Sequence, residues 1–228
     1  MTRRPTAVLI SGRGSNMGAL LAAAADPSYP ARIDLVLSNR PDAAGLRLAE
    51  AAGIATAVVD HRAFRGDRTA FEAALTERLE AAGVEILALA GFLRVLTAGF
   101  VARWQDRLVN IHPSLLPAFP GLDTHARALA AGVKLHGCTV HLVRAGVDDG
   151  PILAQAAVAV HDDDTEASLA ARVLAEEHRI YPPALAALAA GRVRIAGGRA
   201  IVMGAQPPPA ALANPLPVSA APPTPSNT

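Results

Sequence analysis

The residues best suited to chemistry lie at positions 109–117, which read Val-Asn-Ile-His-Pro-Ser-Leu-Leu-Pro. The amide of Asn110 can donate a hydrogen bond to an oxygen that gains negative charge. His112 can act as an acid or a base near neutral pH, and the prolines around it stiffen the chain. The stretch follows a predicted strand, at the edge of a parallel sheet where ligands bind. It therefore predicts a catalytic site.

A second candidate is the glycine-rich loop at positions 11–16, Ser-Gly-Arg-Gly-Ser-Asn, between a predicted strand and a predicted helix. Glycines let the backbone approach an anion, and the amides at a helix start point toward it. The loop lacks the third glycine of a dinucleotide site and the Lys-Ser/Thr ending of a triphosphate loop. It therefore favours a single phosphate, although a tight turn with Ser15 or Asn16 capping the helix is the alternative.

Other polar residues have ordinary structural explanations. The acidic loop at 147–151, Val-Asp-Asp-Gly-Pro, is by itself a common turn sequence. The run 161–164, His-Asp-Asp-Asp, is more typical of a solvated helix cap than of a metal site. The single cysteine, Cys138, excludes an internal disulfide and is expected to be a small buried hydrophobe. No metal site is predicted.

These residues must be positioned by alternating strands and helices, a pattern typical of an α/β fold with helices on both faces of a mostly parallel sheet. Short apolar runs predict five strands in the first half, at Ala7–Ile10, Ile33–Leu37, Thr56–Val59, Glu85–Leu89 and Leu108–Ile111. Helices are predicted at Met17–Ala25, Ala43–Ala52 and Asp67–Ala82. This half is therefore expected to be Rossmann-like.

The pattern changes after Pro120. Lys134–Val143 and Ile152–Val160 alternate in polarity and are separated by a turn, which predicts antiparallel strands that make the sheet mixed. A long helix is predicted over Glu166–Ala190, with an interruption near Tyr181-Pro182-Pro183, and a hairpin over Arg192–Val202.

Histidines in this second half are further candidates for the site. His136 and His141 are expected to face opposite sides of their strand, so that only one of them can point into the site, and His141 is the candidate to line it. His125 follows the proline-glycine turn at 120–121 and is expected near the same region.

Composition limits the class of protein. Of the 228 residues, 51% are hydrophobic and 18% are charged, and the net charge is +1 with both signs interspersed. Such a chain can bury a core, and it offers no overall electrostatic attraction to nucleic acid or a membrane surface. The apolar run after Arg3-Arg4 is too short for a signal peptide, so a cytoplasmic location is expected. The proline-rich, uncharged segment 205–228 is expected to be a disordered tail.

The string Asn-x-His-Pro-Ser-Leu-Leu-Pro at 110–117 resembles the signature of the 10-formyltetrahydrofolate-dependent formyltransferases. Further stretches resemble the members that act on glycinamide ribonucleotide in purine biosynthesis, in the same order and spacing. They are residues 11–16, 90–96 (Ala-Gly-Phe-Leu-Arg-Val-Leu), 119–121 (Phe-Pro-Gly) and 177–182 (Glu-His-Arg-Ile-Tyr-Pro). The resemblance covers roughly residues 6–203.

The resemblance implies a catalytic set of Asn110, His112 and Asp148. Asn110 and a protonated His112 would stabilise the oxyanion of a tetrahedral intermediate, while Asp148 would keep His112 charged and assist proton transfer. The family has two glycines after the aspartate, whereas this chain has Asp149 and Gly150. Aspartate tolerates a positive φ less well than glycine, so the sequence leaves the backbone shape of this loop open.

The resemblance also implies the ligand contacts. Gly14, Ser15 and Asn16 would hold the ribonucleotide phosphate, and Glu177 would accept hydrogen bonds from its sugar or amine end. The co-substrate 10-formyltetrahydrofolate would be surrounded by Arg68, Leu93, Arg94, Val95, Leu96, Asn110, Arg144, Ala145, Gly146, Val147 and Asp148. One domain is expected over 1–204, with its phosphate-binding half at about 1–110 and its folate and catalytic half at 111–204. The partners would be small molecules, and the chain a monomer or a homodimer.

Three other functions stay open. A methionyl-tRNA formyltransferase would carry an additional C-terminal domain, whereas a proline-rich tail follows residue 204 here. A formyltetrahydrofolate hydrolase would carry a regulatory domain before the first strand, which begins near residue 6 here. A non-catalytic module that binds a phosphate-sugar would not need the Asn110–His112–Asp148 set.

Overall fold

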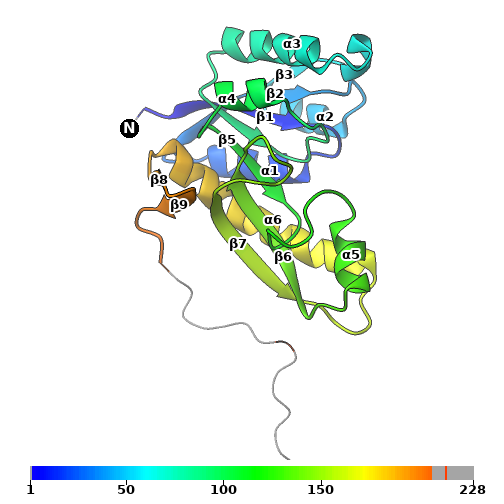
Figure 1. Cartoon of the computed structure of the whole chain (residues 1–228). Helices are drawn as coiled ribbons and strands as arrows, with labels where there is room; N and C mark the ends of the chain where they lie inside the picture. Colours follow the sequence, from blue (N-terminus) through cyan, green and yellow to red (C-terminus); the bar gives the residue numbers. More distant parts are fainter. Residues whose placement is uncertain (1, 207–213, 215–228) are drawn as a thin grey trace, which may run out of the picture.

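The computed structural model describes residues 2–206 and 214. Its centre is a seven-stranded sheet with the strand order β3-β2-β1-β4-β5-β6-β7 (Figure 1). The strands are β1 (Arg4–Ile10), β2 (Ala31–Ser38), β3 (Ala55–Val58), β4 (Ile86–Leu89), β5 (Leu108–His112), β6 (Leu135–Leu142) and β7 (Ile152–Ala159). The first five are parallel, while β6 and β7 are antiparallel to their neighbours. The predicted Rossmann-like sheet that becomes mixed is confirmed.

Helices cover both faces of the sheet, as predicted. They are α1 (Ser15–Ala24), α2 (Ala44–Ala51), the 3-10 turn η1 (His61–Phe64), α3 (Arg68–Ala81), α4 (Ala98–Arg103), α5 (Thr124–Ala130) and α6 (Glu166–Ala189). One buried cluster joins α1, α2 and α6 to one face, and a second joins α3 and α4 to the other. Strand β1 contributes side chains to both clusters, because Val8 and Ile10 belong to the first and Ala7 and Leu9 belong to the second.

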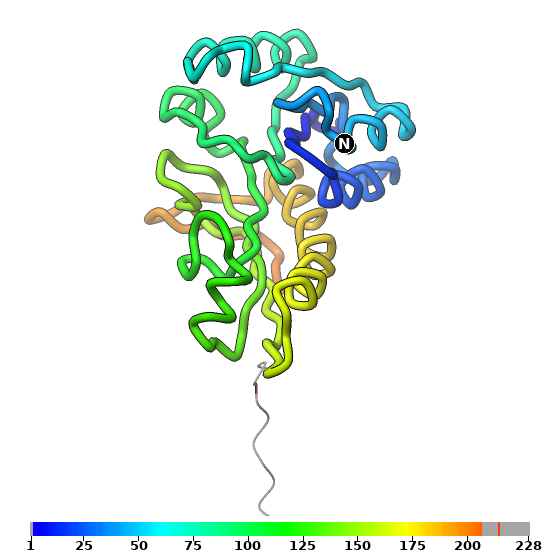
Figure 2. Tube along the Cα trace, turned by 90° about the vertical axis from the view of Figure 1, so that its right-hand side faces the viewer, coloured from blue at the N-terminus to red at the C-terminus, as the bar shows by residue number. Residues whose placement is uncertain are grey.

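The longest helix, α6, differs from its prediction because it continues through Pro182 and Pro183 without an interruption. Two prolines remove two backbone donors, which normally breaks or bends a helix. Here Ile180, Tyr181 and Leu185 are buried against the sheet on either side of the prolines, and this packing outweighs the lost hydrogen bonds. Figure 2 shows α6 as one continuous coil, which packs against α1.

Short elements were missed by the sequence analysis. The helices α4 and α5 and the turn η1 have six, seven and four residues, too few to show a periodic pattern. The predicted hairpin is confirmed as β8 (Val193–Ala196) and β9 (Arg199–Val202), which form a separate two-stranded sheet beside β7.

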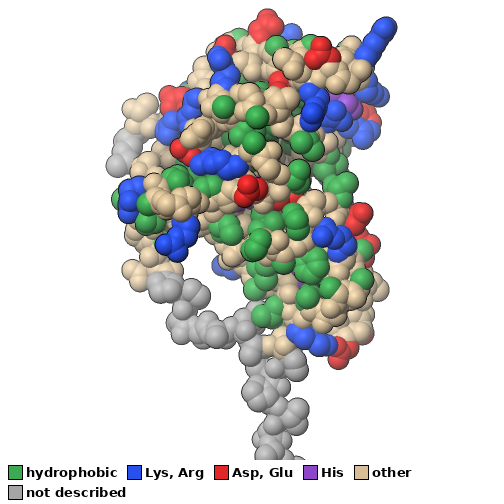
Figure 3. All heavy atoms as spheres, in the orientation of Figure 1, with side chains coloured by type: hydrophobic (Ala, Val, Ile, Leu, Met, Phe, Trp, Pro, Cys, Tyr) green, Lys and Arg blue, Asp and Glu red, His purple; other side chains and the backbone are tan. Residues whose placement is uncertain are grey.

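Two predictions concern the rest of the chain. Within residues 2–206, no helix combines the length and the apolar character needed to cross a membrane. Apart from 205, 206 and 214, the predicted disordered tail lies outside the described residues. On the face shown in Figure 3, basic and acidic side chains are interspersed, as the sequence suggested.

Tyr181 links α6 to the centre of the sheet. Its fully buried hydroxyl lies 2.9 Å from the carbonyl oxygen of Leu89 and 3.2 Å from that of Val109. These carbonyls belong to the last residue of β4 and to the residue before Asn110 in β5. The helix is thereby hydrogen-bonded to both strands at the edge where the candidate residues lie.

We expect Tyr181→Phe to lower the free energy of unfolding by about 1–2 kcal/mol, because two buried carbonyl oxygens lose their shared donor while the ring keeps its packing. Urea denaturation measures the change. Tyr29→Phe is the matched control, since the hydroxyl of Tyr29 donates to Pro182 in a partly buried position and water can replace it. An equal loss in both variants would contradict the structural role given to Tyr181.

Candidate active site

The candidate residues gather at the carboxyl edge of the sheet, around strands β1, β4 and β5. The glycine loop follows β1, segment 90–96 follows β4, and Asn110 and His112 lie at the end of β5. Connections from β1 and β4 run in opposite directions along the sheet, so a crevice opens between these neighbouring strands. In α/β sheets this is the place where ligands bind.

The imidazole of His112 lies between two acceptors. Its Nε2 is 3.0 Å from the carbonyl oxygen of Phe119, and its Nδ1 is 3.4 Å from Oδ2 of Asp148. His112 is buried, and the side chain of Asp148 is only 14% exposed. A ring with a proton on each nitrogen satisfies both acceptors, so the geometry suits the imidazolium form. The predicted contact between His112 and Asp148 is therefore present.

The loop that carries Asp148 is fixed by its own contacts. Oδ2 of Asp148 accepts a hydrogen bond from the backbone N–H of Gly121 at 2.7 Å, which joins this loop to the one that follows β5. The positive φ angles fall on Asp148 (49°) and Gly150 (152°), not on Asp149. A Cβ on Gly150 would lie 1.9 Å from the carbonyl oxygen of Leu142. The position that needs glycine has it, and exposed Asp149 fits without the strain that the sequence left open.

Asn110 points toward β6, where it meets His141. The two residues are cross-strand partners, and Nδ2 of Asn110 is 3.3 Å from Nε2 of His141. Nδ1 of His141 lies 3.1 Å from the carbonyl oxygen of Leu142, which makes it the protonated nitrogen and leaves Nε2 to accept from Asn110. Burial lowers the pKa of His141, which favours this neutral form.

The prediction that His136 and His141 face opposite sides is confirmed. His141 shares the face of Asn110, whereas His136 packs edge-on against His125, with ring centroids 5.3 Å apart. Burial lowers the pKa of His136 to about 4, and neither of its ring nitrogens has a hydrogen-bond partner in the described part of the chain. His136 is therefore a neutral side chain at neutral pH.

The glycine loop leaves the start of α1 without a side-chain cap. Gly14 is the N-cap residue, with φ 78°, and no side chain of the described residues bonds to the first amides of the helix. The alternative interpretation, a cap by Ser15 or Asn16, is therefore wrong. A Cβ on Gly14 would lie 2.9 Å from Cα of Gly45, so close packing on α2 also requires glycine. Free amides at a helix start are suited to an anion.

Glu177 and Asn16 are brought together although they are far apart in the sequence. Nδ2 of Asn16 donates to Oε2 of Glu177 at 2.6 Å, while Oδ1 of Asn16 is buried without a partner among the described residues. Glu177 is 6% exposed, and this burial raises the pKa of its carboxyl. The free helix amides can bind an anionic group, and the adjacent pair, with its unused acceptor, can accept hydrogen bonds from donor groups of the same ligand.

Residues expected around the folate differ in their environments. Leu93, Val95 and Val147 are 71%, 58% and 57% exposed, which is unusual for large apolar side chains in proximity to a crevice. Leu96 is buried in the core with α3 and α4 instead.

Two arginines of that set have other environments. Nη2 of Arg144 lies 2.5 Å from Oδ1 of Asp106, so that its guanidinium is already paired. Arg68 is exposed at the first position of α3. The structure thus unites the expected catalytic residues and the expected phosphate-site residues, but it places Leu96 in the core and pairs Arg144 elsewhere.

Sequence reasoning missed the residues that hold the loop after β5. The hydroxyl of Thr139 donates to the carbonyl of Ser114 at 2.7 Å and accepts from the N–H of Leu116 at 3.0 Å, and Gln155 donates to the carbonyl of Leu116 at 2.9 Å. Polar side chains on the alternating strands β6 and β7 were the signal that could have found them.

The acidic run at 161–164 makes structural contacts at the start of α6. Oδ2 of Asp164 accepts from the N–H of His161 at 2.8 Å and pairs with Arg172. Within residues 2–206 and 214, no group of three or more His, Cys, Asp or Glu side chains is arranged to hold a metal ion.

Comparisons with known proteins agree with this geometry. Residues 4–185 match the family model described as Formyl transferase. The chain is 41% identical over 202 residues to the phosphoribosylglycinamide formyltransferase of Escherichia coli (strain K12), covering 89% of this chain and 95% of that protein. It is 50% identical to the Trifunctional purine biosynthetic protein adenosine-3 of Drosophila melanogaster over 85% of this chain, yet it spans only 14% of that longer relative.

Solved structures are similar over most of the chain. Glycinamide ribonucleotide transformylase 1 from Symbiobacterium toebii superposes with a TM-score of 0.85 and 48% identity, covering 88% of this chain and 94% of that one. The phosphoribosylglycinamide formyltransferase from Brucella melitensis gives a TM-score of 0.79 and 53% identity, covering 86% and 100%.

We expect Glu177→Gln to raise the free energy of unfolding at pH 7. The folded-state pKa of Glu177 lies above its ordinary value of 4.5, so the folded chain holds the proton more tightly than the unfolded chain. Stability therefore falls as pH rises through the folded pKa, and the neutral amide avoids this loss. Chemical denaturation of both proteins from pH 4 to pH 8 measures it, and a stability difference that does not shrink toward acid pH would contradict it.

Proposed function

Since the chain belongs to the formyl transferase family, we propose that it transfers the formyl group of 10-formyltetrahydrofolate to the amine of glycinamide ribonucleotide. The observation that carries the proposal is the placement of His112 between Asp148 and the carbonyl of Phe119. This arrangement stabilises a cationic imidazole beside Asn110 on the crevice side of the sheet. Acyl transfer requires such a group where an oxyanion forms.

The ribonucleotide binds with its phosphate at the start of α1, where the amides after Gly14 are uncapped. Ser15 and Asn16 lie in the first turn, and the buried carboxylate of Glu177 is bonded to Asn16. Glu177 therefore accepts hydrogen bonds from the sugar or the amine of the substrate. This orients the amine toward Asn110 and His112.

The folate lies against the exposed apolar side chains of Leu93, Val95 and Val147. A flat, partly apolar ring system covers such side chains from water. Segment 93–96, the loop 144–148 and Arg68 make up the proposed folate contacts. With Arg144 paired to Asp106, its contribution to folate binding comes from its backbone and the aliphatic part of its side chain.

In the chemical step, the substrate amine attacks the formyl carbon, and a carbon–nitrogen bond forms. The formyl oxygen becomes an oxyanion, which accepts a hydrogen bond from the amide of Asn110 and is stabilised by the positive charge of the nearby His112 imidazolium. The amine nitrogen then loses a proton, and N10 of the folate gains one as its bond to the formyl carbon breaks. Asp148 balances the charge of His112 and receives or relays the moving proton through water. No covalent enzyme intermediate forms.

The proposal extends to the location, the oligomeric state and the domain organisation of the protein. The chain acts in the cytoplasm on small molecules, as a monomer or a homodimer, and its folded domain covers residues 1–204 with phosphate binding in the first half and formyl transfer in the second. A non-catalytic phosphate-sugar module is the alternative function, but it gives no reason for a buried histidine paired with an aspartate.

Incubation of the protein with 10-formyltetrahydrofolate and glycinamide ribonucleotide tests the function, with deformylated folate and formylated ribonucleotide as the products measured. Activity only with charged initiator tRNA would identify a methionyl-tRNA formyltransferase instead. Formate released without an acceptor would identify a hydrolase, and binding of both ligands without turnover would identify the module.

We expect His112→Ala and Asp148→Asn each to lower kcat about 10²–10³-fold with much smaller changes in substrate affinity, because each loses charge stabilisation that matters most in the transition state. Asp149→Asn is the matched control for Asp148→Asn, since it removes the neighbouring, exposed carboxylate. Steady-state kinetics separate kcat from KM. Near-native turnover in both site variants, or an equal loss in the control, would remove the pair from the mechanism.

A further inference from the structure

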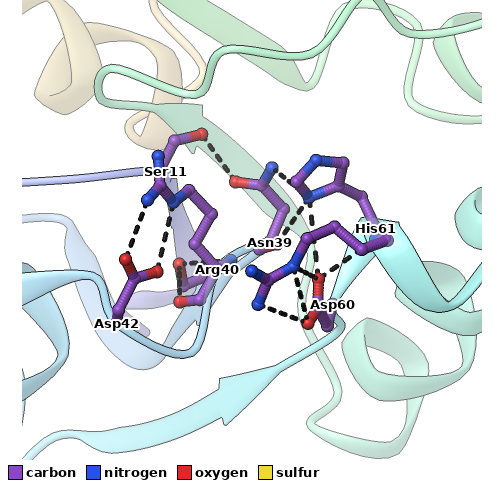
Figure 4. Close-up of polar contacts among 8 residues, drawn as sticks. Ser11, Asn39, Arg40, Asp42, Asp60 and His61 are labelled. Atoms are coloured by element: carbon purple, nitrogen blue, oxygen red, sulfur yellow. Dashed lines mark hydrogen bonds and ion pairs between the residues drawn. The ribbon is translucent and has the colours of Figure 1, made fainter.

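A line of hydrogen-bonded polar side chains crosses the carboxyl edge of the sheet beside the candidate active site (Figure 4). The hydroxyl of Ser11 donates to Oδ1 of Asn39 at 2.6 Å, and Nδ2 of Asn39 lies 3.2 Å from Nδ1 of His61. Ser11 and Asn39 are 4% and 2% exposed. Buried polar side chains of this kind are retained in proteins when they hold other groups in place.

This line of side chains ends at the backbone of segment 93–96, which we propose as a folate contact. The N–H of Leu93 donates to the hydroxyl oxygen of Ser11 at 2.8 Å. His61, Asn39, Ser11 and Leu93 follow strands β3, β2, β1 and β4, which is the order of these strands in the sheet. A single line of side chains thus crosses the edge from its outermost parallel strand to the crevice.

Segment 91–96 depends on Ser11 for its position. It has no regular secondary structure, and in the described part of the chain its hydrogen bonds to other segments are two, both to Ser11. The N–H of Ser11 donates to the carbonyl of Gly91 at 3.1 Å, and the hydroxyl accepts from Leu93. Phe92 and Leu96 anchor the segment in the core, while Leu93 and Val95 stay exposed.

Asn39 determines the direction of the Ser11 hydroxyl. Because the oxygen of Ser11 accepts from Leu93, its proton is free to donate, and Oδ1 of Asn39 is the acceptor. The amide group of Asn39 then points toward His61, whose Nδ1 is also 2.9 Å from the carbonyl oxygen of Asn39. The direction of the Ser11 hydroxyl thus follows from its contacts with Leu93 and Asn39.

We propose that Ser11, oriented by Asn39, is a positioning residue for the folate co-substrate. Its hydroxyl holds Leu93 and Val95 at the crevice from the side of the phosphate loop, so one residue connects the two binding sites. This inference rests on the proposed function, because it takes segment 93–96 as the folate contact. Ser11 itself touches neither substrate.

The phosphate loop does not need this hydroxyl. The carbonyl of Gly12 accepts from the N–H of Gly45 at 3.0 Å, and Gly14 packs directly against Gly45. Loss of the Ser11 hydroxyl therefore releases the backbone at Leu93, between the buried Phe92 and Leu96, while the loop that binds the ribonucleotide stays attached to α2. The expected effect is selective for one of the two substrates.

The test compares Ser11→Ala with Ser38→Ala. Ser38 is also fully buried at the end of its strand, and its hydroxyl also donates one hydrogen bond and accepts one, both with the backbone of Arg40. The two variants thus lose the same group in similar surroundings. Only Ser11 contacts segment 91–96.

We expect Ser11→Ala to weaken binding of 10-formyltetrahydrofolate about tenfold, the usual effect of losing one buried hydrogen bond. Binding of glycinamide ribonucleotide and kcat at saturation stay near native, and the amide of Leu93 exchanges its hydrogen faster. Ser38→Ala leaves all four measurements near native. Calorimetry with each ligand alone, steady-state kinetics and hydrogen exchange provide the readouts.

Asn39→Ala keeps Ser11 and removes the acceptor of its hydroxyl, so a smaller loss of folate affinity is expected. If Ser11→Ala fails to fold, Asn39→Ala provides the test instead. Native folate affinity in both variants, or an equal loss in Ser38→Ala, would overturn the inference. A native protein that binds no 10-formyltetrahydrofolate would instead overturn the proposed function, and this inference with it.

Discussion

The candidate active site depends on one electrostatic contact, the imidazole of His112 held by the carboxylate of Asp148. The contact joins the last residue of β5 to the loop before β7, and the two residues lie 36 positions apart in the sequence. The segments on the two sides of the contact are held separately: Thr139 and Gln155 hold the segment after β5, and Gly150 allows the close turn before β7. The N–H of Gly121 then links them through Asp148. Burial strengthens such a contact because little water competes with it.

The parallel half of the fold could be predicted from the sequence because its short apolar strands alternate regularly with helices. Apolar runs between helices of ten or so residues predict parallel strands, and each predicted strand appears within a few positions of its observed bounds. The continuity of the helix α6 was harder to predict, because Pro182 and Pro183 normally indicate a break and no nearby residue indicates otherwise. Its continuity comes from burial of Tyr181 and Leu185 on the sheet, which only the folded structure reveals.

The proposed catalytic residues could be found from a motif and a family resemblance, whereas the contacts that hold them could not. Asn110 and His112 lie close together in a distinctive string, and Asp148 follows from the resemblance. The contacts of His141 with Asn110 and of Ser11 with Leu93 could not be predicted, because a contact across strands depends on register and strand order. The same holds for the folate set, since sequence could not tell that Leu96 turns into the core or that Arg144 pairs with Asp106.

The helix α6 carries Glu177 beside the glycine loop and, one turn later, Tyr181 under β4 and β5. The proposed substrate contact of Glu177 and the attachment of α6 to β4 and β5 therefore depend on the spacing of these two residues along one helix. A residue inserted between them would rotate everything after it by roughly 100° and separate the two contacts. Residues added at either end of the helix would leave this spacing of four positions unchanged.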